Sequence, residues 1–244
     1  PLAITNCLNF GNPENQEIMG EFAECLEGVK EACNFLNYPV VSGNVSFYNG
    51  TNKKNIYPTP VIGGVGLIKK LSNSVSHNFK KINSTIILIG KTFGHIEQSC
   101  FLRENYSITE GMPPEINFLN EKNNGESLLK LIDKNLILSA HDISSGGLIT
   151  ALAEMALSSN YGAKIHKPKK LTNLFKYFFG EDQARYIVET QTQNLPMVEK
   201  ILKENNVYYE NIGATQENYF EIEGELKIST KDLFKVNNQW YNSY

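Results

Sequence analysis

Apolar side chains recur at three- and four-residue steps between Glu14 and Asn37, the spacing of one face of an α-helix. Asn12-Pro13 predicts where this helix starts, because Asn caps free backbone amides and Pro at the first helical position has no amide to satisfy. Residues 1–4 are apolar and predict the end of a buried strand, and residues 5–13 form a polar stretch typical of a loop. We therefore expect strand, loop and helix in that order.

Short apolar runs predict strands along the rest of the chain. Residues 38–42 form one, broken by Gly43-Asn44, and residues 61–68 form another. The polar residues 71–83 are typical of a linker. Beyond it we expect strands over 85–89, 136–139 and 184–189, helices over 115–134, 148–158 and 195–205, and a hairpin over 220–228 that turns at Gly224.

Strands and helices interleave on both sides of the expected linker, which is typical of a mixed α/β (α+β) fold. The 244 residues fit one large or two small domains. We expect a sheet-forming domain over residues 1–72, truncated at its start, and an α/β domain over residues 83–244.

Composition excludes several classes of protein. Hydrophobic residues make up 41% and the formal net charge is −3, which argues against wholesale disorder and against a polybasic nucleic-acid surface. No apolar run reaches the roughly 18–20 residues of a membrane span, and no secretory signal is recognisable. We expect a cytoplasmic protein with neither nucleic-acid nor membrane partners, whose four cysteines are buried and reduced. Because the chain opens on Pro1, we also expect an excised or processed piece.

Four polar, glycine-bearing segments follow apolar strands in this reading, and such strand-end loops commonly bind ligands. They cover residues 5–12, 42–46, 141–147 and 180–183. In the third, Asp142 offers a hard oxygen ligand for Mg²⁺, and the following helix start offers amides to phosphate oxygens. Alternatively, Asp142 or Ser145 only caps the helix. His141 can be a general base or a structural residue.

The other segments have equally ordinary explanations. Gly43, Asn44 and Ser46 offer a close backbone approach, an amide oxygen and a hydroxyl, but they are also common turn residues. Residues 181–183 can hold a metal or a ribose, or can be a solvated acidic loop, and residues 167–170 read as a solvated basic turn.

Several catalytic motifs are missing. The sequence has no Walker A, no strand leading into G-x-G-x-x-G, and no G-x-S-x-G. A cysteine–histidine nucleophile pair at Cys7 or Cys100 stays open, although nothing in the sequence places a histidine directly beside either cysteine.

Five segments together resemble one family, the phosphoribosylformylglycinamidine synthases, in the synthetase subunit of the bacterial multi-subunit form. They occur in order and nearly span the chain: ITNCLNFGNPE (4–14), PVVSGNVS (39–46), PTPVIGGVG (58–66), SAHDISSGGL (139–148) and FGEDQ (179–183). The resemblance places the chain in the superfamily of aminoimidazole ribonucleotide synthetase. The synthetase of this family is an internal duplication, and this chain resembles its second half.

The resemblance implies a purine-biosynthesis ligase that uses ATP and Mg²⁺. Such a ligase converts formylglycinamide ribonucleotide and glutamine-derived ammonia into the formylglycinamidine, releasing ADP, phosphate and glutamate. Implied partners are the first half of the same synthetase, a glutaminase subunit and a small bridging subunit, and self-pairing into a homodimer is a further possibility. The fragment alone is expected to be inactive, because the family's catalytic histidines match no histidine here.

Carried over by position, the resemblance implies ATP contacts for Asn6 and Gly43, a Mg²⁺ ligand in Asn44, and a ribonucleotide contact for Ser46. Asn6 departs from the family, which has Asp there: either an amide replaces the same hydrogen bond, or nucleotide affinity changes. By its counterpart in the first half, Asp142 is implied as a second metal ligand in a pseudo-symmetric nucleotide site.

Two other functions remain open. One is another ATP-using enzyme of the superfamily, of the selenophosphate synthetase or thiamine-phosphate kinase type. The other is a non-catalytic nucleotide-binding or assembly module. The sequence Asn9-Phe10-Gly11-Asn12-Pro13, followed by a long helix, favours the synthase over the first of these.

Overall fold

Two units make up the chain, Pro1–Leu71 and Ser72–Tyr244, in a computed structural model that describes residues 1–168 and 173–242. Lys169 and Lys170 of the predicted basic turn lie outside the described residues. Each unit has its own sheet and its own core.

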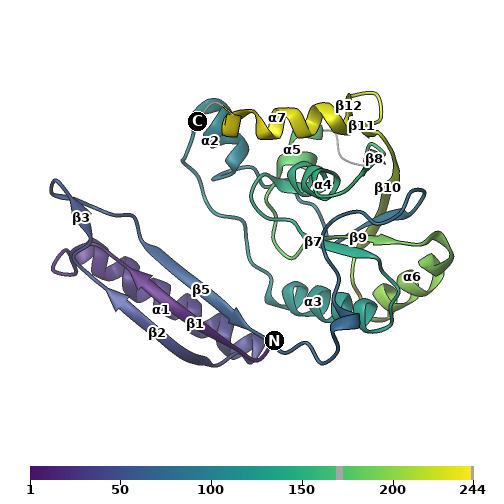
Figure 1. Cartoon of the computed structure of the whole chain (residues 1–244). Coiled ribbons are helices and arrows are strands. Elements are labelled where there is room, and N and C mark those ends of the chain that lie inside the picture. The colour runs from purple at the N-terminus through teal and green to yellow at the C-terminus, as the bar shows by residue number, and fades with distance from the viewer. Residues whose placement is uncertain (169–172, 243–244) are drawn as a thin grey trace. The chain divides into compact units, whose positions relative to one another are not determined.

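The first unit is a three-stranded sheet with one long helix on it (Figure 1). Strand β1 (Ala3–Asn9) is central, pairing in parallel with β2 (Val40–Ser46) and antiparallel with β5 (Thr59–Val65). Helix α1 (Gln16–Leu36) covers one face, and Leu8, Phe10 and Ile18 form the buried core beneath it. A small ladder joins β3 (Gly50–Thr51) to β4 (Lys54–Asn55).

Helix α1 begins three residues later than the Asn12-Pro13 signal predicts. Asn15 is its N-cap, with the side-chain oxygen accepting the Glu17 amide at 2.9 Å. Asn12 makes a similar bond to the amide of Glu14, so it closes a turn before the helix. At the other end, Asn37 adopts a left-handed conformation (φ 58°) that ends the helix near its predicted boundary.

Two expected loops of this unit are wrong, because β1 continues to Asn9 and β2 runs unbroken through Gly43 to Ser46. In β1, alternate residues point to one face, which buries Leu8 against α1 while the polar residues between remain tolerable in a strand. The polar composition of residues 5–9 therefore marks a half-covered strand instead of a loop.

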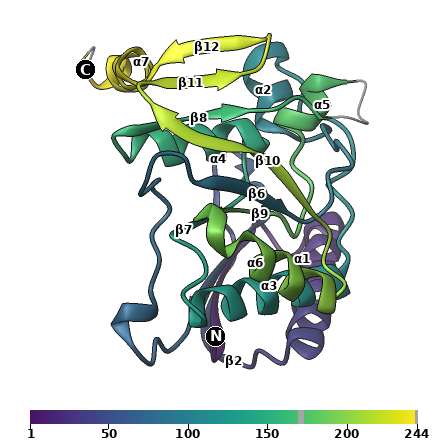
Figure 2. The ribbon, with the colours of Figure 1, turned by 90° about the vertical axis from the view of Figure 1, so that its right-hand side faces the viewer.

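The second unit is a seven-stranded sheet with helices on both faces (Figure 2). Its strand order is β12 (Leu226–Ser229), β11 (Tyr219–Ile222), β8 (Tyr161–Ile165), β10 (Tyr209–Glu217), β6 (Thr85–Ile89), β9 (Tyr186–Thr190) and β7 (Ser139–Asp142). Helices α3 (Phe118–Asp133) and α6 (Leu195–Glu204) cover one face. The other face carries α4 (Gly147–Leu157), with α5 (Leu174–Phe179) and α7 (Thr230–Asn242) beside it. The expected mixed α/β fold is confirmed.

Strand β6 is buried along its whole length and separates two cores. Ile86 and Leu88 pack into the core beneath α4, whereas Ile87 and Ile89 pack into the core beneath α3 and α6. A strand covered on both faces reads as a continuous apolar run, which is why the sequence predicts β6 so well.

The predicted linker belongs to the second unit for most of its length. A 3-10 turn (Leu71–Asn73) is followed by residues whose backbone meets β7, where the Ala140 amide donates to the Ser76 carbonyl at 3.2 Å. Phe79 is 1% exposed and lies in the core beneath α4. The Glu189 carboxylate accepts the amides of Lys80 and Lys81 at 2.8 and 3.0 Å, so this polar stretch is anchored and is not a free linker.

The sequence did not indicate several elements: α2 (Cys100–Tyr106), β8, α5, β10 and α7. All four cysteines are free thiols, but they are half-buried instead of buried. Among the described residues, no helix combines the length and the apolar character needed to cross a membrane.

Replacing Gly162 with Ala is expected to destabilise the second unit. A Cβ at Gly162 would overlap the carbonyl oxygen and carbon of Tyr219 on β11, so Gly162→Ala pushes β8 and β11 apart. We expect a loss of about 1–3 kcal/mol in the free energy of unfolding, measured by urea denaturation. The matched control is Gly125→Ala in α3, where a Cβ meets only the Tyr186 hydroxyl at 3.8 Å. It is expected to gain about 0.5–1 kcal/mol, and equal losses for both variants contradict the account.

Candidate functional site

The four predicted site residues of the first unit lie on two adjacent parallel strands. In the register of β1 and β2, Asn6 is opposite Gly43, Cys7 opposite Asn44, and Asn9 opposite Ser46. The residues that the sequence places 37 positions apart are therefore neighbours in the sheet.

Their side chains do not all lie on one face. Asn6 and Gly43 share the face of Leu8, which α1 covers, because alternate residues of a strand point the same way. By the same rule, Asn44 and Ser46 lie on the opposite face, with Cys7 and Asn9. The four predicted residues therefore divide between the two faces of this sheet, and their individual roles stay predictions.

Gly43 fits closely against Asn6. A Cβ at Gly43 would overlap the side-chain oxygen of Asn6, so only glycine lets that amide lie across β2. Strand β2 is also an edge strand of the described sheet, and an edge strand keeps outward-facing backbone groups available to a ligand. Both features suit a contact through the backbone of Gly43.

Ser46 has local partners already. Its hydroxyl lies 3.3 Å from Asn49 Oδ1 and 3.1 Å from Asn49 Nδ2, and the same Nδ2 donates to the Phe10 carbonyl at 3.0 Å. This arrangement closes the turn after β2. Ser46 therefore has a structural role in that turn, whether or not it also contacts a substrate. Asn44 is exposed.

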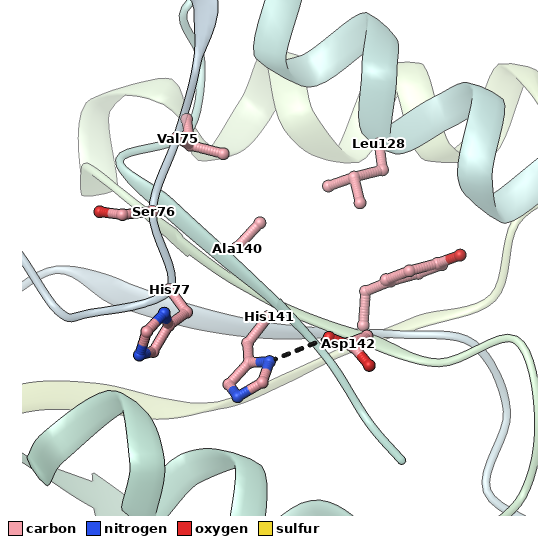
Figure 3. Close-up of a pocket in the computed structure, with 8 residues that line it drawn as sticks. Val75, Ser76, His77, Leu128, Ala140, His141 and Asp142 are labelled. Atoms are coloured by element: carbon pink, nitrogen blue, oxygen red, sulfur yellow. Dashed lines mark hydrogen bonds and ion pairs between the residues drawn. The ribbon is translucent and has the colours of Figure 1, made fainter. Parts of the chain in front are cut away.

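In the second unit, Asp142 ends β7 and lines a cavity of about 430 Å³ (Figure 3). Val75, Leu128 and Ala140 form the apolar part of its wall, and His77 and His141 lie side by side, with ring centroids 5.2 Å apart. The Asp142 carboxylate faces Nδ1 of His141 at 3.2 Å.

His141 is held on both sides. Its Nδ1 meets Asp142, and its Nε2 lies 3.0 Å from the Glu154 carboxylate on α4. A histidine between two carboxylates has both ring nitrogens occupied, which favours the structural reading over that of a general base.

Neither Asp142 nor Ser145 caps α4. The N-cap is Gly146, at φ 83°, with no side-chain cap, and its amide donates instead to Glu181 Oε1 at 2.8 Å. That same oxygen accepts the Cys100 amide at the start of α2, also at 2.8 Å. Glu181 therefore joins two helix starts and is not a solvated acidic residue.

Asp182 is buried, 5% exposed, and its carboxylate accepts three consecutive backbone amides. Phe93 and Gly94 donate to Oδ2 at 3.0 and 2.8 Å, and His95 donates to Oδ1 at 3.1 Å. These bonds fix the segment that follows β6.

Arg185 lies beneath this arrangement and is 1% exposed. It donates to the Asp182 carbonyl at 3.1 Å, to Thr92 Oγ1 at 3.2 Å and to the Gly180 carbonyl at 2.5 Å. Burial lowers the pKa of the guanidinium, and the nearby Asp182 carboxylate opposes that shift. Sequence reasoning missed Arg185, because nothing local distinguishes a buried arginine from a surface one.

Within residues 1–168 and 173–242, no group of three or more His, Cys, Asp or Glu residues forms a metal cluster. A structural zinc centre needs such a set of ligands, whereas Mg²⁺ is commonly held by one or two protein oxygens together with substrate phosphates. Single oxygen donors such as the Asn44 amide and the Asp142 carboxylate suit the second arrangement.

Comparison with protein-family models matches both units. Residues 1–68 match the N-terminal domain of AIR synthase related protein, and residues 81–223 match its C-terminal domain. The chain belongs to the AIR synthase related protein family.

Curated relatives of this family member are named phosphoribosylformylglycinamidine synthase subunit PurL. The chain is 51% identical over 244 residues to that of Pelagibacter ubique (strain HTCC1062) and 43% identical over 244 residues to that of Rhodopseudomonas palustris (strain HaA2). In both cases the match covers 100% of this chain and 33% of the relative, so the chain spans about a third of their length.

Solved structures show the same fold at low identity. PurL of T. maritima complexed with FGAR aligns with a TM-score of 0.76 and 17% identity, covering 96% of this chain and 39% of that one. A HypE–HypF complex aligns with a TM-score of 0.68 and 15% identity, covering 94% and 77% of the two chains.

Removing the Asp182 carboxylate is expected to leave the amides of Phe93, Gly94 and His95 without their acceptor. We expect Asp182→Ala to lose about 3–5 kcal/mol in the free energy of unfolding, measured by urea denaturation, since it also uncovers the charge of Arg185. Asp133→Ala, at the exposed C-terminal end of α3, is the control and is expected to cause no loss, because it removes a negative charge from a helix C-terminus. A loss below about 1 kcal/mol for Asp182→Ala counts against this role.

Asn6 and Gly43 are expected to be energetically coupled. Gly43→Ala alone forces the Asn6 side chain aside at a cost of about 1–3 kcal/mol. In the double variant with Asn6→Ala that overlap with the side chain is gone, so the second substitution costs less than it does alone. A double-mutant cycle of unfolding free energies measures this, and strictly additive effects contradict the contact.

Proposed function

We propose that the chain forms part of the synthetase of phosphoribosylformylglycinamidine synthase, a ligase of purine biosynthesis in the cytoplasm. The proposed reaction uses ATP to convert formylglycinamide ribonucleotide and ammonia into formylglycinamidine ribonucleotide. The 51% identity to a PurL subunit over the entire chain is the observation that carries this proposal. The two family domains, matched in order, agree with it.

ATP is the nucleotide in this proposal. Solved PurL structures that share the fold are described as complexes with ATP, ADP and AMPPCP. On this chain the adjacent pair Asn6 and Gly43 would contact the nucleotide, with the edge-strand backbone at Gly43 as the closest approach. Asn6 is neutral where the family has Asp, so any contact it makes to ATP is a hydrogen bond without charge.

Mg²⁺ would be held at two separate sites, each with one oxygen ligand of this chain together with phosphate oxygens. Asn44 offers an exposed amide oxygen, and Asp142 offers a carboxylate whose described partner is one histidine nitrogen. When bound, the ion would neutralise phosphate charge. Ser46 would contact the ribonucleotide. Its partner Asn49 fixes the hydroxyl in place beforehand.

Partners follow from the same proposal. The first half of the synthetase, a glutaminase subunit and a small bridging subunit would complete the complex. One chain of a solved PurLQS structure from Thermotoga maritima contains this fold. We propose no activity for these 244 residues by themselves.

A chimaera tests the proposal. These 244 residues replace the matched third of the P. ubique subunit, and the purified protein is assayed with ATP, Mg²⁺, formylglycinamide ribonucleotide and an ammonium salt as the nitrogen source. We expect ATP-dependent formation of the amidine. A folded chimaera that forms no product, under conditions in which the unaltered subunit does, contradicts the proposal.

Asn44→Ala in the chimaera refines the test. Loss of a metal ligand is expected to lower activity at least about tenfold, with partial recovery as Mg²⁺ is raised. The matched control is Asn34→Ala on the exposed side of α1, which is expected to retain full activity. Equal activity of the two variants excludes the role proposed for Asn44.

A further inference from the structure

A cavity of about 680 Å³ lies at one end of the second unit's sheet, and none of the residues that line it is among those proposed above to bind ATP, Mg²⁺ or the ribonucleotide. It forms where β6 and β8 end and β10 begins. Backbone bonds hold these segments together: the Gly90 amide donates to the Tyr208 carbonyl, and the His166 amide donates to the Ile212 carbonyl, both at 2.8 Å. The wall is therefore built on strand ends, which place side chains more firmly than free loops do.

A carboxylate is fixed on the wall of this cavity. Glu210 accepts the Tyr177 hydroxyl at 3.2 Å through Oε2 and the Tyr208 hydroxyl at 2.6 Å through Oε1. Burial and this carboxylate raise the pKa of Tyr177, and the hydrogen bond to Glu210 raises the pKa of Tyr208 to about 12, so both phenols stay protonated donors. Each carboxylate oxygen keeps a further acceptor position for a ligand.

Hydrogen-bond donors also line this cavity, and Lys91 and Thr92 are two of them. Arg185 donates to Thr92 Oγ1, so the proton of the Thr92 hydroxyl is left to donate to another acceptor. The Lys91 ammonium lies 4.9 Å from the Phe93 ring centroid, a contact that leaves its N–H groups able to meet an oxygen acceptor. His166 adds a ring whose Nδ1 is held by Glu223 at 3.0 Å.

We propose that this cavity binds a phosphorylated sugar, with Lys91 and Thr92 holding the phosphate and Glu210 accepting the sugar hydroxyls. An ammonium and a hydroxyl suit phosphate oxygens, whereas a fixed carboxylate repels a bare anion and accepts hydroxyl donors. The half-exposed Tyr208 ring supplies an apolar wall for the sugar, and the volume lies in the range of small-molecule sites. None of these residues takes part in the proposed ATP contact, so either proposal can fail alone.

Calorimetry with the 244-residue chain tests this site. Ribose 5-phosphate is expected to bind saturably, with ribose and inorganic phosphate each at least about tenfold weaker, because each offers only half of the required groups. AMP that binds as tightly as ribose 5-phosphate also supports the site and identifies a nucleotide as the source of the sugar phosphate. No saturable binding of either ester at millimolar concentration overturns the proposal, as does phosphate binding as tight as the ester.

Variants locate the binding. Lys91→Gln and Glu210→Gln are each expected to weaken ribose 5-phosphate at least about tenfold. Lys235→Gln on α7, which removes the same charge away from the cavity, is expected to leave the affinity unchanged. Lys91 is exposed, so its variant tests the site even where Glu210→Gln unfolds, and unchanged affinity in Lys91→Gln overturns the assignment.

Discussion

The second unit depends on one buried cation, the guanidinium of Arg185, and on the carboxylate of Asp182 beside it. A charge taken out of water is tolerated only when its hydrogen bonds are made, and here they are made to two backbone carbonyls and a threonine hydroxyl. Asp182 in turn fixes the backbone after β6, and Glu181 fixes the starts of α2 and α4. Residues 180–185 thus fix three other parts of the chain: the segment after β6, the start of α2 and the start of α4.

The same constraint extends to the neighbouring backbone and to the cavity proposed above to bind a sugar phosphate. Close approach is part of it: Gly147, at φ 72°, lies against the backbone of residues 178–180, where any Cβ would meet Gly180 O. Thr92, whose hydroxyl accepts from Arg185, lines the proposed sugar-phosphate cavity, so the buried cation orients a donor in that cavity. In the first unit, the Asn6 side chain is positioned differently. Gly43 on the neighbouring strand β2 has no Cβ, and this leaves room for the Asn6 amide.

The sequence predicted the fold class, helix α1 and the strand β6, because each has strong periodicity or a continuous apolar run. It failed where polar residues lie in strands, as at Asn6 and Asn44, because a half-covered strand and a loop share the same composition. It also failed at Phe79 and Arg185, whose burial follows from contacts with segments distant in sequence. Asp142 is the last residue of β7, which covers residues 139–142 and not the predicted 136–139, and the bond from the Gly146 amide to Glu181 depends on tertiary structure.

Hydrogen exchange of three amides tests the central claim most directly. The amides of Phe93, Gly94 and His95 follow a strand in a segment without secondary structure, and such amides usually exchange quickly. Because all three donate to the buried Asp182, we expect them to exchange as slowly as the amide of Ile87 in β6. Exchange of all three at the rate of an exposed loop would contradict the account.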